Sequence, residues 1–142
     1  MKTLLITLVL ITCTYLYGQS NDYVYSYDDM LLEEQLELIN KHQDTLDTLI
    51  KCESNYNNQA INKNDGAKGE HSEGILQYKF KTFKEKALKY NVFPYAEEYE
   101  LENFYRDPYS QKLITAIMLE NEDRPLCHWE VCSRSIRDYK CR

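Results

Sequence analysis

Glu53 is the residue whose type and position most clearly suggest chemistry. It lies three residues after Ile50, four after Leu49 and seven after Leu46, so in a helix its carboxyl group falls on the same face as these apolar side chains. Apolar surroundings favour the neutral form of a carboxyl group, and a protonated carboxyl group can donate to the leaving oxygen of a glycosidic bond. The spacing makes Glu53 a candidate general acid. The competing interpretation is that the helix ends earlier and leaves Glu53 in solvent.

Other titratable residues are weaker candidates for catalysis. Asp65, Glu70 and Glu73 lie in a polar stretch, where one of them could act as the second carboxylate of an inverting glycosidase. Acidic residues in loops are more often simply solvated. We expect His71 and His128 to be surface or packing residues rather than ligands.

The elements that must position these residues are predicted to be mainly helical. Residues 19–29 are polar and rich in tyrosine without a helical period, which indicates an extended leader. A helix is predicted over 30–53 with Asp28 or Asp29 as its N-cap, and the polar stretch 40–45 could divide it in two. Residues 54–73 read as loop, with only weak strand signals in the connections. The other predicted helices cover residues 82–90, residues 107–120 with an Asp107-Pro108 start, and a short segment from His128.

Apolar periodicity predicts which faces of these helices are buried. The predicted core residues are Leu32, Leu36, Ile39, Leu46, Leu49 and Ile50 in the first helix, Phe83, Ala87 and Leu88 in the second, and Leu113, Ile114, Ile117 and Met118 in the third.

The N-terminus has the pattern of an export signal. Met1 and Lys2 precede an apolar run of about ten residues, which is too short for a permanent membrane span, and a polar stretch follows from Tyr17. Cleavage after Gly18 would leave 142 − 18 = 124 residues and 16 − 23 = −7 formal charges. The alternatives are a lipid-modified N-terminus at Cys13 and a retained anchor.

The cysteines bear on both the compartment and metal binding. Without Cys13, four remain: Cys52, Cys127, Cys132 and Cys141. In an exported chain this even number predicts two disulfides with three possible connectivities. At least one bridge must close a loop of roughly 75 to 90 residues, because Cys52 is distant from the other three. The set lacks the CxxC pairs and the His spacing of zinc sites, so we expect no metal and no cofactor.

The acidic balance excludes some function classes. The chain has 17 Lys and Arg against 23 Asp and Glu. Non-specific nucleic-acid binders and proteins that lie on anionic membranes need a basic surface, so we expect neither a nucleic-acid partner nor stable membrane insertion after signal removal. Sugars and proteins remain open as ligands. The mature length suits one compact domain and a monomer.

A series of short motifs over residues 46–132 extends the prediction for Glu53. In chain order they are Glu53-Ser54 followed by asparagines, Gly74-Ile75-Leu76-Gln77 with Tyr78, Thr82-Phe83, Gln111-Lys112-Leu113 after Asp107-Pro108, and His128-Trp129. In order and spacing they resemble the lytic transglycosylase family, which has the goose-type lysozyme fold. In that family a Glu-Ser pair ends a helix, the Glu is the catalytic acid/base, and a Gly-Leu-Met-Gln-like segment lines the saccharide groove.

The resemblance implies a fold, an activity and a set of site residues. The implied fold is mainly α (α+β lysozyme-like), a single compact, disulfide-linked helical domain over residues 30–142 with a substrate groove. The implied activity is secreted cleavage of the β-1,4 bond between MurNAc and GlcNAc of peptidoglycan by Glu53, as a lytic transglycosylase or a lysozyme. The substrate-binding residues that it implies are Ser54, Gly74, Ile75, Gln77 and Tyr78.

Some features depart from the family or leave alternatives open. The family's Tyr-Asn-Ala-Gly segment has no match in this chain. The acidic charge also disfavours binding to an anionic wall, unless basic residues such as Lys63, Lys68, Lys79 and Lys81 gather beside the groove. A secreted non-catalytic lysozyme-like binding or inhibitory module is therefore the main alternative, and an unrelated disulfide-linked helical protein is another. Trp129 could stack on sugar, but the flanking Cys127 and Cys132 favour a packed, disulfide-supported corner. Within the resemblance, Cys52 would tie the helix of Glu53 to this corner through Cys132 or Cys127. The tyrosines that could line a groove or be half-buried in the core are Tyr90, Tyr95, Tyr99, Tyr105 and Tyr109.

Overall fold

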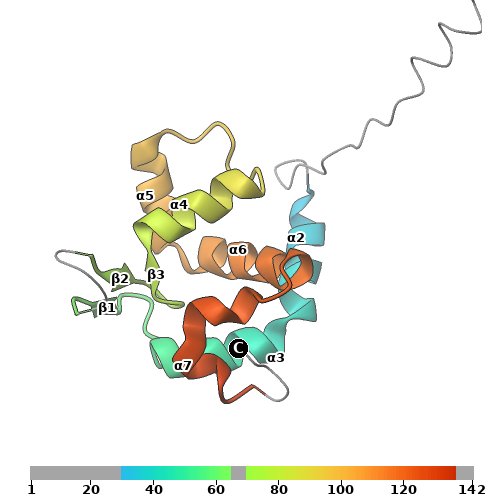
Figure 1. The fold of residues 1–142 in the computed structure, drawn as a ribbon. Coiled ribbons are helices and arrows are strands. Elements are labelled where there is room, and N and C mark those ends of the chain that lie inside the picture. Colours follow the sequence, from blue (N-terminus) through green and yellow to red (C-terminus); the bar gives the residue numbers. More distant parts are fainter. Residues whose placement is uncertain (1–29, 65–69, 137–142) are drawn as a thin grey trace, which may run out of the picture.

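The computed structural model describes residues 30–64 and 70–136, which form a mainly helical compact domain with a small sheet (Figure 1). The predicted leader, the signal segment and the Asp28 or Asp29 cap lie outside the described residues. The helices are α2 (Leu32–Lys41), α3 (Gln43–Glu53), α4 (Phe80–Lys89), α5 (Glu98–Arg106), α6 (Pro108–Asn121), the 3-10 helix η2 (Pro125–Trp129) and α7 (Glu130–Ser133). The strands are β1 (Ile61–Asn62), β2 (Ser72–Glu73) and β3 (Tyr78–Lys79). No helix within the described ranges is long and apolar enough to cross a membrane.

The first predicted helix is divided, as the polar stretch 40–45 suggested. His42 ends α2 and precedes α3, and its side chain lies 2.5 Å from a carboxylate oxygen of Glu120 on α6. Ile39, Leu46, Leu49 and Ile50 are buried as expected. The predicted burial of Leu32 and Leu36 is wrong, because these side chains are 63% and 43% exposed on the outer turns of α2.

Helix α6 supplies the centre of the core. Leu113, Ile114, Ile117 and Met118 are all at most 1% exposed, which confirms the predicted buried face. The predicted start is also confirmed, since the Asp107 carboxylate accepts a hydrogen bond from the Ser110 backbone N–H and Pro108 occupies the first turn. Figure 1 shows α6 lying between α2 on one side and the α4–α5 pair on the other.

Helices α4 and α5 form one end of the domain. Phe83 and Ala87 are buried, but Leu88 is 63% exposed, so its predicted place in the core is wrong. Helix α5 was not predicted, because its sequence EYELENFYR is dominated by polar residues and has a narrow apolar face. Leu101 and Tyr105 form that buried face.

The sheet has the antiparallel order β1-β2-β3. Ile61 pairs with Glu73 and Asn62 with Ser72, while Ser72 and Glu73 pair in turn with Lys79 and Tyr78. Each strand has two residues, which is why the polar sequence of 54–73 shows little strand periodicity.

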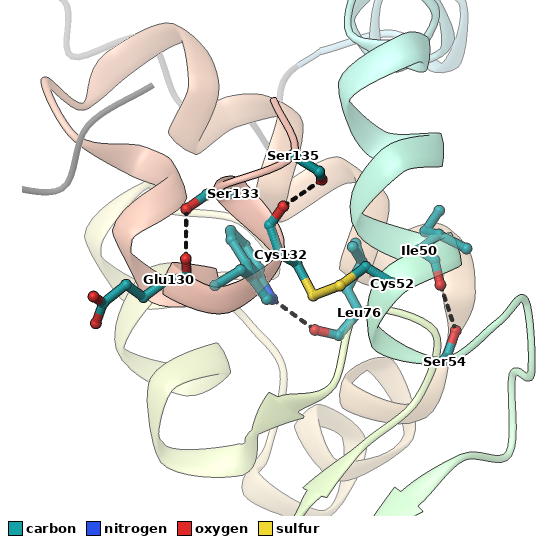
Figure 2. The surroundings of a disulfide bond; sticks show 9 residues. Ile50, Cys52, Ser54, Leu76, Glu130, Cys132, Ser133 and Ser135 are labelled. Atoms are coloured by element: carbon teal, nitrogen blue, oxygen red, sulfur yellow. Dashed lines mark hydrogen bonds between the residues drawn. A yellow bond between two sulfur atoms is a disulfide. The ribbon is translucent and has the colours of Figure 1, made fainter. Parts of the chain in front are cut away.

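A disulfide joins two helices that lie far apart in the sequence. Cys52 of α3 and Cys132 of α7 are bonded across a sequence separation of 80 residues, with a Cα–Cα distance of 5.7 Å (Figure 2). This confirms the expected tether through one of its two alternatives. Cys127 is also disulfide-bonded, while Cys13 and Cys141 lie outside the described residues. The bridge anchors α7 directly against the last turn of α3.

We expect the double substitution Cys52→Ser/Cys132→Ser to lower the free energy of unfolding by about 4–5 kcal/mol, because the disulfide closes a loop across a sequence separation of 80 residues and its loss frees that loop in the unfolded chain. Chemical denaturation followed by circular dichroism measures the change. The matched control is Val131→Ser, which alters a neighbouring α7 side chain that is 74% exposed and should change stability little. Equal stability of the double variant and the control would contradict the proposed tethering role.

Candidate active site

Glu53 is the last residue of α3, and its side chain is half-buried. The competing interpretation, in which the helix ends earlier, is therefore wrong. Ser54 closes the helix, since its backbone N–H and its hydroxyl both donate to the Ile50 carbonyl at 3.1 Å. The carboxylate of Glu53 and the sulfurs of Cys52 and Cys132 all lie within 4.8 Å of one another. The disulfide thus fixes the position of the helix turn that carries Glu53.

The chain reverses sharply after this helix end. Asn55 and Tyr56 both adopt left-handed backbone conformations, with φ of 50° and 65°. Such angles cost roughly 1–3 kcal/mol for a residue other than glycine and are found preferentially at functional sites. The reversal sends the chain into β1, so that the small sheet begins a few residues beyond Glu53.

The Gly74–Gln77 turn is built around a buried glutamine of α6. Gln111 is fully buried, and its Oε1 accepts from the Leu76 backbone N–H at 2.8 Å. Its Nε2 donates to the carbonyls of Glu73 at 2.9 Å and Tyr105 at 2.6 Å. Gly74 has φ 85°, and a Cβ there would collide with the Gln111 amide group. A glycine is therefore required at position 74 because the backbone of the turn approaches the Gln111 side chain closely.

Gln77 is held by its own neighbourhood. Its backbone is left-handed with φ 51°, and its Nε2 donates to the carbonyls of Ala60 at 3.0 Å and Gly74 at 2.8 Å. Its Oε1 accepts from the Ser72 hydroxyl at 3.1 Å. These bonds engage both the nitrogen and the oxygen of the amide group. Gln77 therefore links the residue before β1 to the Gly74–Gln77 turn.

Ile75 and Tyr78, two of the expected substrate-binding residues, lie in the core. They are 6% and 3% exposed. The Tyr78 hydroxyl is 2.8 Å from the Thr115 hydroxyl and donates to the Met118 sulfur at 3.4 Å, and burial raises its pKa. Its ring packs edge-on against Phe83 and Trp129. Tyr78 thus packs in the core and anchors the end of the Gly74–Gln77 turn.

Trp129 joins the turn to the disulfide corner. It is 5% exposed, and its indole N–H donates to the Leu76 carbonyl at 2.7 Å. Cys132 follows one turn later, so the same short segment is bonded to the turn and to α3. Trp129 is a packed residue, as the flanking cysteines suggested.

A cavity of about 350 Å³ opens between the start of α4 and η2. Its lining residues are Gln77, Tyr78, Lys79, Thr82, Cys127, His128 and Trp129. Burial, with the nearby Lys86 ammonium, lowers the pKa of His128. Figure 1 shows the end of α3 beside the sheet, with α7 close by. Gln77 and Trp129 connect this cavity to the turn, whereas Glu53 is not among its lining residues.

Glu73 lines a different cavity from the one beside Gln77 and His128. Its carboxylate pairs with Arg106 at 2.8 Å and with His71 at 2.6 Å, and it lines a second cavity, of about 660 Å³, with Asn58, Gly74 and Pro108. Burial opposes its ionisation, but the bonds from Arg106 and His71 prevail and lower its pKa. Glu70 is an exposed partner of Lys79 at 3.6 Å, and Asp65 lies outside the described residues.

Glu122, directly after α6, is the centre of an ionic cluster. Its carboxylate accepts from Lys86 at 2.6 Å, Lys89 at 2.9 Å and the Tyr90 hydroxyl at 2.5 Å. Burial opposes ionisation, but these three bonds outweigh it and lower the pKa of Glu122 to about 2. The cluster ties the end of α4 to the end of α6. Its polar sequence alone carried no signal of this role.

The tyrosines divide between core and surface. Tyr90 and Tyr105 are buried, and Tyr109 is half-buried with its hydroxyl donating to Gln35. Tyr95 and Tyr99 are 88% and 67% exposed and lie on the loop before α5 and on α5 itself, away from the end of α3.

One group of His, Cys, Asp or Glu side chains within residues 30–64 and 70–136 has its ligand atoms close enough together to hold a metal ion. It consists of Cys52, Glu53 and Cys132. Both sulfurs are in the disulfide and offer no thiolate, so this group cannot bind zinc as a cysteine site does.

Comparisons with known proteins return no matching family model, curated protein or solved structure.

The contact between Gly74 and Gln111 predicts a coupled effect on stability. We expect Gly74→Ala to lower the free energy of unfolding by about 3 kcal/mol, since it adds a clash and backbone strain. In a Gln111→Ala background the clash partner is gone, and the same substitution should cost at least about 1 kcal/mol less. Urea denaturation of the four proteins in this cycle measures the coupling. Strictly additive losses would show that Gly74 is not required by Gln111.

Proposed function

We propose that the protein is a secreted peptidoglycan-cleaving glycosidase that cuts the β-1,4 bond between MurNAc and GlcNAc, with Glu53 as its general acid/base. The observation that carries the proposal is the position of Glu53 at the end of α3. The disulfide holds the last turn of α3 against α7, and the small sheet with the Gly74–Gln77 turn comes next in the sequence. The order of motifs that resembles lytic transglycosylases supports the same assignment. Disulfides are typical of exported proteins, which agrees with secretion.

One carboxyl group suffices for this chemistry. The protonated Glu53 carboxyl would donate to the glycosidic oxygen while the sugar develops oxocarbenium character. The carboxylate formed would then accept a proton from the nucleophile. That nucleophile is the 6-hydroxyl of the same muramyl residue in a transglycosylase and water in a lysozyme. Glu73 is engaged by Arg106 and His71 in the other cavity, so a single-acid mechanism fits better than an inverting carboxylate pair.

The 350 Å³ cavity is the proposed place for part of the saccharide. It adjoins the Gly74–Gln77 turn through Gln77, and Lys79, Thr82 and His128 offer polar groups at its wall. The net charge of −7 expected after signal removal opposes binding to an anionic wall, and Lys79 supplies a positive charge at the cavity that would offset it locally. Of the other three lysines expected to offset that charge, Lys63 and Lys81 are exposed but do not line this cavity, and Lys68 lies outside the described residues.

A non-catalytic lysozyme-like binding or inhibitory module is the second candidate. The internal bonding of Gln77 favours it, because an amide group already engaged at both ends has less capacity to bind sugar. In this alternative the fold binds glycan without turnover.

Digestion of purified peptidoglycan distinguishes the two candidates. We expect wild type to release muropeptides and Glu53→Gln to release them at least about 100-fold more slowly, because the amide cannot donate the required proton. Mass spectrometry of the products identifies the nucleophile, since anhydro ends indicate transglycosylation and reducing ends indicate hydrolysis. The matched control, Glu85→Gln, changes an exposed carboxylate on α4 and should retain wild-type activity.

Two outcomes would count against catalysis by Glu53. Equal release by wild type and Glu53→Gln would remove Glu53 from the mechanism. Sedimentation of wild type with peptidoglycan but without any release would establish the binding module instead.

A further inference from the structure

A small aromatic cavity lies at the far end of the domain from Glu53. It has a volume of about 270 Å³ and is lined by Phe93, Pro94, Tyr95, Ala96, Glu100 and Phe104. Figure 1 shows that the loop between α4 and α5, which provides most of these residues, lies at the opposite end of the domain from α7. The volume is just below the range of about 300–1,000 Å³ for pockets that hold drug-sized ligands, so it suits a small chemical group.

The aromatic rings at this cavity are held in an unusual arrangement. Phe93 and Phe104 stack with their centroids 4.2 Å apart and their planes 12° apart. Phe93 has φ 60°, which is rare for a bulky residue and tends to persist where a site needs it. Tyr95, next but one, is 88% exposed. Phe93 and Phe104 pack with one side against the hydrophobic core, and together with Tyr95 they provide aromatic surface at the solvent boundary.

The charge around the cavity is negative. Glu100 lines it, and Glu97 and Glu98 lie just before Glu100 in the sequence, at the start of α5. One oxygen of Glu100 accepts from the Glu97 backbone N–H at 2.8 Å, which fixes the side chain at the start of α5. The nearby Lys84 is paired with Glu98 at 2.8 Å. Aromatic faces combined with a carboxylate attract cations and repel anions.

The geometry points to a binding site for an organic ammonium group, of the trimethylammonium or alkylammonium type, in the cavity formed by Phe93, Tyr95, Glu100 and Phe104. The aromatic faces would provide cation–π attraction and Glu100 the balancing charge. The same chemistry occurs in soluble amines and in choline lipid headgroups. This site is separate from the proposed glycosidase function and does not depend on it.

Binding of choline to the full chain, followed by two-dimensional NMR, tests the site. We expect saturable shifts of the amide signals of Tyr95, Glu100 and Phe104. The uncharged isostere 3,3-dimethyl-1-butanol should bind at least about tenfold more weakly, because it has the shape of choline without the charge. Equal binding of both ligands, or no saturable shift with choline, would overturn the assignment.

Three variants locate the effect. Tyr95→Ala and Glu100→Gln should each weaken choline binding by about tenfold, since one removes an aromatic face and the other the charge. Both are expected to fold, because Tyr95 is exposed and the glutamine oxygen can still accept from the Glu97 N–H. The matched control, Tyr56→Ala, removes a tyrosine that is 52% exposed elsewhere and should bind choline normally. Unchanged binding in Tyr95→Ala and Glu100→Gln would also overturn the assignment.

Sedimentation with phosphatidylcholine vesicles separates the two sources of the group. Co-sedimentation that Tyr95→Ala abolishes would support recognition of the lipid headgroup, whereas choline binding without co-sedimentation would support a soluble amine.

Discussion

The buried amide of Gln111 is the interaction on which the candidate site depends. It joins three segments at once: α6, the turn after β2 and the end of α5. A buried polar group stabilises a fold only when its hydrogen bonds are satisfied, and both the oxygen and the nitrogen of this amide bond backbone groups. Gly74 lacks a side chain so that the turn can approach this amide. The path of the chain from Ser72 to Tyr78 follows from that one contact.

Trp129 and the Cys52–Cys132 disulfide attach α3 and α7 to the turn that Gln111 holds. The indole bonds the Leu76 carbonyl on the other side of the turn, and Cys132 bonds the last turn of α3. Glu53 is therefore held to the same framework as the turn. Left-handed residues occur at Asn55, Tyr56 and Gln77, where this framework bends the chain most sharply. Such rigidity is what an acid that must meet a bound sugar in a defined geometry requires.

The sequence predicted features that depend on local chemistry and missed those that depend on tertiary contacts. The core face and cap of α6, the division near His42 and the burial of Trp129 follow from periodicity, capping and flanking residues. Helix α5 was missed because tertiary packing of Leu101 and Tyr105 stabilises a polar segment. Gln77 and Tyr78 both line the 350 Å³ cavity, but their bonds to Ala60 and Thr115 join distant parts of the chain and leave no signal in the local sequence. Cysteine spacing left three partners open for Cys52 and the resemblance left two, and the approach of α7 to α3 selects Cys132.

The central claim is that the end of α3 and the adjoining turn and cavity bind a glycan. The most direct measurement is an NMR titration of the Glu53→Gln variant with a soluble MurNAc–GlcNAc oligosaccharide, which this variant is expected to bind without cleaving. The account predicts saturable amide shifts at position 53 and at Gln77, Lys79 and His128, with the loop before α5 unaffected. Absence of shifts around position 53 and this cavity, or shifts confined to another surface, would contradict it.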